Sequence, residues 1–375
     1  MTEISSPKPS SGALGVSRRT LMRSAGAVGA VTLGAAATRL FTSSSIAAPI
    51  MSPADLSALR NPPICHVAGT SDVGPVGPAR KLKLTWNANA ICTVGVPVAA
   101  QRGIFARHGL DVELINFGGS TDQLLEAIST GKADAGVGMA LRWLKPLEQG
   151  FDVRITTAVH GGCMRLFTTP SSGIASIADL KGKVVGVSDM AAPDKNFFSI
   201  VAAKQGIDPN DDIQWRQFPP DLLGVALKKG EIQAFSLGDP LAWVIRERDG
   251  LREIANNLSG EYQHRACCVL GISGTLIRTE RPVAAGLTQA LLEAQEYVAA
   301  NPDEAAALFA QYSPTPVAQL AAMLRSHTHD HHPTGAALKE ELAAYTEELK
   351  LVHVIKPSTN TARFADKVFA DVLSV

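Results

Sequence analysis

The sequence lacks a surplus of positive charge. It holds 35 Lys and Arg residues against 35 Asp and Glu residues, so its formal net charge is zero. Residues 1–47 contribute five basic residues and one acidic residue, and without them 30 basic and 34 acidic residues remain, a charge of −4. A mildly acidic chain argues against nucleic acid as a partner, because binding to phosphate backbones depends on basic surfaces.

The motifs of several enzyme classes are absent as well. The chain contains no G-x-x-x-x-G-K phosphate loop, no H-E-x-x-H, no C-x-x-C pair and no G-x-S-x-G elbow. Each of these motifs places reacting groups in a specific geometry. Nothing in the sequence therefore demands catalysis, and we predict a protein that is not an enzyme and needs no cofactor.

Cysteine is scarce and irregularly spaced. The five cysteines lie at positions 65, 92, 163, 267 and 268. An odd number without regular spacing shows no disulfide framework, so at least one thiol is free or bridged to another molecule.

The N-terminal stretch has no apolar run long enough for a stable membrane span. Arg18-Arg19 precede a weakly apolar Ala/Gly/Val segment, and small residues follow at Ser45-Ile46-Ala47. This pattern predicts an export signal over residues 1–47, and SRRTLM resembles the twin-arginine type. An ordinary secretory signal with a chance Arg pair is the alternative. Either signal predicts a periplasmic protein, and the twin-arginine route, which exports folded chains, allows core thiols to stay reduced.

The rest of the chain divides by pattern. Residues 48–80 are rich in Pro and Gly and indicate an extended linker. From Lys81 onward, short β-branched runs alternate with helical patterns, which is typical of parallel α/β sheets. The nearly 300 residues after the linker are more than a single hydrophobic core usually holds, so we expect two lobes. After about residue 280 the pattern is almost wholly helical.

Five segments carry a family likeness. They are PVAAQRGIFARHGLDVELINF, LLEAISTGKADAGVGM, GIASIADLKGKVVGV, KQGIDPNDDIQWRQF and ALKKGEIQAFSLGDPLAW. Over roughly residues 82 to 275 their order and spacing resemble substrate-binding proteins of ABC importers of the nitrate/sulfonate/taurine and thiamine-precursor (NMT1/THI5-like) type.

The resemblance implies a type II periplasmic-binding fold, in which two α/β lobes are joined by two crossing strands and a helical region follows at the C-terminus. Lobe 1 would comprise residues 81–163 and 270–375, and lobe 2 residues 164–269. A monomer would hold a small-molecule solute in the cleft between the lobes, close by hinge bending, and deliver the solute to an ABC permease in the inner membrane.

The expected sheet topology predicts which residues bind the solute. In open parallel sheets, ligands bind beyond the carboxyl ends of the strands, where loops lead into helices. With the hinge segment, this rule gives Trp86, Asn87, Asn89, Gly119, Ser120, Met139, His160, Cys163, Asp189, Asp239 and Trp243. Each also has a structural alternative, since Gly119 and Ser120 suit a turn and N-cap, and the tryptophans, Trp143 included, suit a lobe core.

Two aspartates bear on the class of ligand. An unpaired carboxylate beside an anion is unfavourable, so Asp189 and Asp239 argue against nitrate or a plain sulfonate and favour a ligand with a cationic or N–H donor group. Helix capping is the alternative role for either aspartate.

Sulfur and imidazole gather at predicted turns and at the hinge. The residues are Cys92, Met139, His160, Cys163, Met190, Cys267 and Cys268. A shared site of several of them would suit a thiol, a thioether or a soft metal, whereas single buried Cys and Met residues are often core fillers. In HGGC, we expect His160 and Cys163 to face the cleft; the alternative is a buried histidine bonded to backbone beside an inert thiol.

A separate histidine tract, RSHTHDHHPTG, places His327, His329, His331 and His332 around Asp330. Such tracts bind zinc, nickel or copper, and the alternative is a solvated loop between two helices. Three functions therefore stay open: a solute-binding protein, a thiamine-pyrimidine synthase-like enzyme on the same fold, and a carrier of a metal or thiol ligand.

Overall fold

The computed structural model describes residues 78–117 and 121–374. The predicted export signal, nearly all of the predicted linker, and the candidate site residues Gly119 and Ser120 lie outside these residues. All of the structure below belongs to one compact unit within Thr70–Val375.

The first sheet has the strand order β2-β1-β3-β10-β4. β1 is parallel to β2 and β3, whereas β10 is antiparallel to both β3 and β4. In β1, Leu82 and Leu84 are buried while Lys81 and Lys83 are exposed, as a strand with one covered face requires. The strands are β1 (Arg80–Trp86), β2 (Leu110–Asn116), β3 (Ala135–Met139), β4 (Val153–His160) and β10 (Cys268–Ser273).

The second sheet has the order β7-β6-β8-β5-β9. β6 is parallel to β7 and β8, whereas β5 is antiparallel to β8 and β9. Its strands are β5 (Met164–Thr168), β6 (Val184–Val187), β7 (Gln214–Gln217), β8 (Ala234–Gly238) and β9 (Arg252–Asn256). The two sheets thus share one plan, three parallel strands beside two others.

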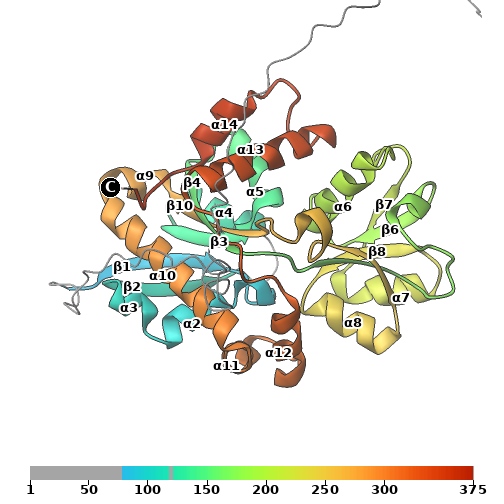
Figure 1. Ribbon diagram of the computed structural model, residues 1–375, viewed down its shortest axis with the longest axis horizontal. Helices are drawn as coiled ribbons and strands as arrows, with labels where there is room; N and C mark the ends of the chain where they lie inside the picture. The colour runs from blue at the N-terminus through green and yellow to red at the C-terminus, as the bar shows by residue number, and fades with distance from the viewer. Residues whose placement is uncertain (1–77, 118–120, 375) are drawn as a thin grey trace, which may run out of the picture. The chain divides into compact units, whose positions relative to one another are not determined.

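Helices surround both sheets (Figure 1). α10 packs on α2 and α3 beside the first sheet, and α6, α7 and α8 contact β8 of the second sheet. The helices are α2 (Gly95–Gln101), α3 (Ile104–Arg107), α4 (Thr121–Ser129), α5 (Ala140–Glu148), α6 (Pro193–Lys204), α7 (Leu223–Lys228), α8 (Leu241–Asp249), α9 (Gly274–Thr279), α10 (Arg281–Ala300), α11 (Pro302–Phe309), α12 (Val317–Ser326), α13 (Gly335–Leu351) and α14 (Thr361–Val368). Short 3-10 turns are η1 (Ile91–Thr93), η2 (Ile177–Leu180), η3 (Pro220–Leu222), η4 (Gly260–Tyr262) and η5 (Ala310–Tyr312).

Trp143 lies in the core of the first lobe rather than at the cleft. Its side chain is fully buried, and its ring packs on Gly138 of β3 and Gly271 of β10. A Cβ atom at Gly138 would come within 2.1 Å of the ring, and one at Gly271 within 2.7 Å, so both positions exclude any larger residue.

Among the described residues, no helix is long and apolar enough to cross a membrane.

The chain passes between the sheets twice. It leaves β4 at His160 and enters β5 at Met164, and it returns between Asn256 of β9 and Cys268 of β10. The predicted lobe boundaries at 163/164 and 269/270 stay predictions. Gly161 and Gly162 admit a close approach, but the approaching groups are Thr328 and Asn257 of the protein itself.

Candidate solute-binding cleft

A cavity of about 360 Å³ opens where the carboxyl ends of the parallel strands of both sheets meet. Residues after β1 and β3 line one side, residues after β6 and β8 line the other, and the first crossing closes one end. Six of the residues nominated from the sequence line it: Asn87, Asn89, Met139, Cys163, Asp189 and Asp239. The rule that ligands bind beyond strand ends explains why residues so far apart in sequence meet here.

Three nominated residues lie outside this lining. Trp86 is 1% exposed and packs edge-on against Tyr312, with ring centroids 4.9 Å apart. Trp243 stacks with the Arg246 guanidinium, 4.3 Å from its ring centroid. His160 is fully buried behind the cleft.

Arg142 is a cleft residue that the sequence reasoning missed. It lies in the first turn of α5 and joins two carboxylates that belong to different lobes. Its Nε donates to Asp122 of α4 at 2.6 Å, and its Nη1 donates to Asp189, which follows β6, at 3.1 Å. Because both carboxylates already engage the guanidinium, its charge is compensated before any ligand arrives.

Asp189 is held in place by the protein. Besides the Arg142 contact, its carboxylate accepts the Ala191 backbone N–H, as in an Asx turn. Partial burial opposes ionisation, but the hydrogen bonds from Ala191 and Arg142 prevail and lower the pKa of Asp189. Asp189 is therefore ionised at neutral pH.

Asp194 is a second cleft residue that was not predicted from the sequence. It lies at the start of α6, is buried, and accepts a 2.6 Å hydrogen bond from Ser236 Oγ. Burial raises the pKa of Asp194. A carboxyl group of this kind at the floor of a cavity can present a hydrogen-bond acceptor to a solute.

Asp239 is bound on all sides by the protein. Both carboxylate oxygens accept from Arg165 Nε, at 2.9 and 3.1 Å, and Oδ2 also lies 2.9 Å from His327 Nε2. Oδ1 accepts the Trp243 backbone N–H in the first turn of α8. The structure thus shows the capping contact that was the alternative role for Asp239, and the side chain is fully buried.

His160 and His327 form a buried imidazole pair behind the cleft. His160 Nδ1 lies 3.1 Å from the Gly161 carbonyl oxygen, and His160 Nε2 lies 3.2 Å from His327 Nδ1. The carbonyl at one end and the Asp239 carboxylate at the other both accept, so the two outer nitrogens donate. Burial, followed by the proximity of His327, lowers the pKa of His160 well below its ordinary value.

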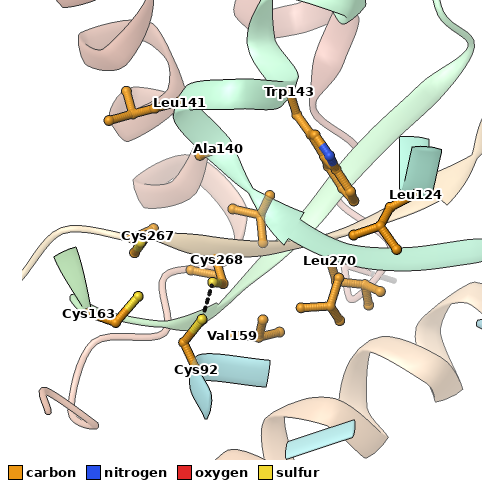
Figure 2. Packing of buried hydrophobic residues seen from close by; sticks show 14 of the residues in the cluster. Cys92, Leu124, Ala140, Leu141, Trp143, Val159, Cys163, Cys267, Cys268 and Leu270 are labelled. Carbon is orange, nitrogen blue, oxygen red and sulfur yellow. Dashed lines mark hydrogen bonds between the residues drawn. The ribbon is translucent and has the colours of Figure 1, made fainter. Parts of the chain in front are cut away.

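Four thiols lie close together (Figure 2), and the sulfur atoms of Cys92 and Cys268 lie within 4.8 Å of a His160 ring nitrogen. Cys92 of η1 and Cys268 of β10 lie with their sulfur atoms 3.3 Å apart, and Cys163 and Cys267 lie next to them. Hydrogen bonds that the Cys92 thiol donates to Cys163 and Cys268, together with burial, raise the pKa of Cys92 well above its ordinary value. Hydrogen bonds from Cys267 and Cys92 lower the pKa of Cys268 to about 6. Of the sulfur residues predicted at turns and at the hinge, the four cysteines lie together, Met139 lines the cavity, and Met190 is 47% exposed.

The histidine tract divides among separate partners. His327 joins the pair described above, His329 Nε2 contacts the Leu324 carbonyl at 2.6 Å, and His331 Nε2 contacts Glu341 at 3.0 Å. Within the described part of the chain, the set whose ligand atoms converge is instead Cys92, His160 and Cys268. A metal site in the tract stays a prediction.

The architecture and the cleft define a class. Two sheets of this order, joined by two crossings around a cavity, form the fold of periplasmic binding proteins. Over 78% of its length this chain is similar to the periplasmic aliphatic sulphonate binding protein SsuA from Escherichia coli, covering 92% of that chain with a TM-score of 0.66 at 16% identity. The predicted fold is therefore confirmed.

Sequence comparison gives the family. The NMT1/THI5 like family model matches residues 92–305, and the chain belongs to this family. A protein of Brucella abortus (strain 2308), named as a candidate binding protein, is 28% identical over 218 residues, or 57% of this chain and 66% of the relative, slightly under two thirds. A candidate thiamine biosynthesis protein of Haemophilus influenzae is 25% identical over 252 residues, or 64% of this chain and 76% of the relative.

Proposed function

We propose that this protein is the solute-binding component of an ABC importer. The observation that carries the proposal is the cavity of about 360 Å³, to which both sheets contribute residues at the carboxyl ends of their parallel strands. That volume suits a small organic solute. A site built from two lobes also couples binding to closure, because a solute that contacts both sides favours the closed state.

The charges of the cleft favour a solute with N–H donors or a cationic group. Of the aspartates that line the cavity, Asp239 is paired with Arg165 and Asp189 with Arg142. Asp194 instead accepts a hydrogen bond from Ser236 and forms no ion pair with any described residue. Arg142 is already paired with Asp122 and Asp189. A sulfonate or nitrate would find no uncompensated positive charge among the described lining residues, whereas a donor group would find the Asp194 carboxyl.

We further propose that the protein is exported and delivers its solute to a membrane permease. The pattern of residues 1–47 supports export, by the twin-arginine route, into the periplasm. There the protein, as a monomer, would pass its solute to a permease in the inner membrane. Hinge bending at the two crossings supplies the open and closed states that such delivery needs.

A thiamine-pyrimidine synthase-like enzyme is the second candidate, because the Haemophilus relative is named for thiamine biosynthesis. Such an enzyme needs a lysine for its cofactor and a catalytic histidine in the cleft. The described lining of the cavity contains neither residue type. This composition supports binding without chemistry.

The test is native mass spectrometry of protein purified from its own periplasm. We expect a non-covalent adduct of one small organic molecule, lost from a variant in which Asn87, Asn89 and Asp194 are replaced by Ala, Ala and Asn. A control variant, Asp211→Asn, changes an exposed carboxylate outside the cavity and should keep the adduct. A cofactor bound through a lysine would support the enzyme, and an adduct retained by the triple variant would refute the site.

A further inference from the structure

Behind the cleft, three side chains from separate elements bring potential metal ligands together. Cys92 comes from η1, His160 ends β4, and Cys268 begins β10. Sγ of each cysteine and one ring nitrogen of the histidine all lie within 4.8 Å of one another, and all three residues are fully buried. Cys92 and Cys268 are 176 positions apart in the sequence, so only the fold creates this group.

The set is chemically selective. It offers two sulfur atoms and one imidazole nitrogen but no carboxylate. Thiolate and imidazole ligands favour Zn²⁺ and Cu⁺ over Mg²⁺ or Ca²⁺, which prefer oxygen. Zinc–sulfur bonds of about 2.3 Å in a tetrahedral site place two sulfur atoms about 3.8 Å apart. The observed separation of 3.3 Å between Cys92 and Cys268 is close to that arrangement.

The histidine is oriented as ligating histidines are. Its Nδ1–H donates to the Gly161 carbonyl oxygen at 3.1 Å, which fixes the ring and leaves Nε2 with the free lone pair. Nε2 lies 3.2 Å from His327 Nδ1, and His327 Nε2 lies 2.9 Å from Asp239 Oδ2. A histidine whose Nδ1–H is held by a carbonyl oxygen presents its Nε2 lone pair in the orientation that metal-ligating histidines use.

We propose that Cys92, Cys268 and His160 form a binding site for a thiophilic metal ion, Zn²⁺ or Cu⁺, behind the solute cleft. Cys163 and Cys267 lie beside this site and complete a soft, dry environment. Binding deprotonates the thiols that ligate the ion and releases those protons to solvent. The ion would link η1 to β4 and β10, next to the point where the chain first crosses between the sheets. This inference does not depend on the proposed function.

Titration of the reduced full chain under anaerobic conditions tests the site. Zn²⁺ alone and Cu⁺ alone are added in separate samples, and metal content is measured after desalting. We expect one equivalent of at least one of the two ions to be retained by the wild type and by Cys267→Ser, the matched control. Retention should fall at least tenfold in Cys92→Ser, Cys268→Ser and His160→Gln.

A second measurement keeps the test decisive if buried substitutions prevent folding. X-ray absorption spectra of the metal-loaded wild type should show sulfur neighbours at about 2.3 Å and nitrogen at about 2.0 Å. Four results would overturn the proposal: no retained metal, retention unchanged in Cys92→Ser and Cys268→Ser, a spectrum with oxygen and nitrogen neighbours only, or a Cys92–Cys268 disulfide that persists under reducing conditions.

Discussion

Arg142 and Asp189 form an ion pair across the cleft, with Nη1 and Oδ1 3.1 Å apart. Arg142 follows β3 of the first sheet, and Asp189 follows β6 of the second. The pair therefore joins the two walls of the cavity. Its arginine is largely buried, whereas Asp189 is 51% exposed.

Asp189→Asn should favour the open state of the solute-free protein. Partly exposed ion pairs contribute about 0.2–1 kcal/mol, so the ratio of closed to open molecules should fall by roughly 1.4- to 5-fold. Small-angle scattering should show a larger radius of gyration. Asp122→Asn is the matched control, because Asp122 binds the same guanidinium from within the first lobe. Equal expansion of both variants would contradict the role of the ion pair.

Asp239→Asn should mainly destabilise the fold. Its carboxylate binds Arg165, His327 and the Trp243 N–H, and breaking one partner of a buried ion pair costs about 3–5 kcal/mol. Denaturant unfolding beside calorimetric titration with the co-purified solute separates the two roles. Weaker solute binding at unchanged stability would instead support direct contact with the ligand.

Cys163 should report occupancy of the cleft. Cys163 lines the cavity but is only 1% exposed. A small alkylating reagent should therefore reach its thiol only when the lobes open. Saturating solute should slow its labelling, measured by peptide mapping, and leave the rate at Cys267, which is outside the lining, unchanged. If solute left the Cys163 rate unchanged, the residue would not face the cleft.

Acid should destabilise the protein partly through His332. Burial lowers the pKa of His332 to about 4, so between about pH 6.5 and pH 4 the unfolded chain binds a proton that the folded chain does not. Stability should therefore fall as the pH decreases through this window, by on the order of 1–3 kcal/mol for this residue. His332→Gln should show a smaller loss in urea unfolding at pH 7 and pH 4.5. Identical losses would contradict the prediction.

Much of this structure could be predicted from sequence, but not the partners of charged groups. Strand and helix alternation gave the α/β class, and the rule about strand ends placed Asn87, Met139 and Asp189 at the cavity. The same rule extended by one helical turn would have found Arg142 and Asp194. The carboxylate partners of Arg142 and the coupling of His327 to Asp239 depend on contacts between distant segments, which local patterns do not encode.

The central claim is that a solute binds between the two sheets. A crystal structure of the protein with its co-purified solute tests this claim most directly. We predict solute density in the cavity, in contact with Asn89 on one side and Asp194 on the other. Density confined to one lobe, or outside the cavity, would contradict the account.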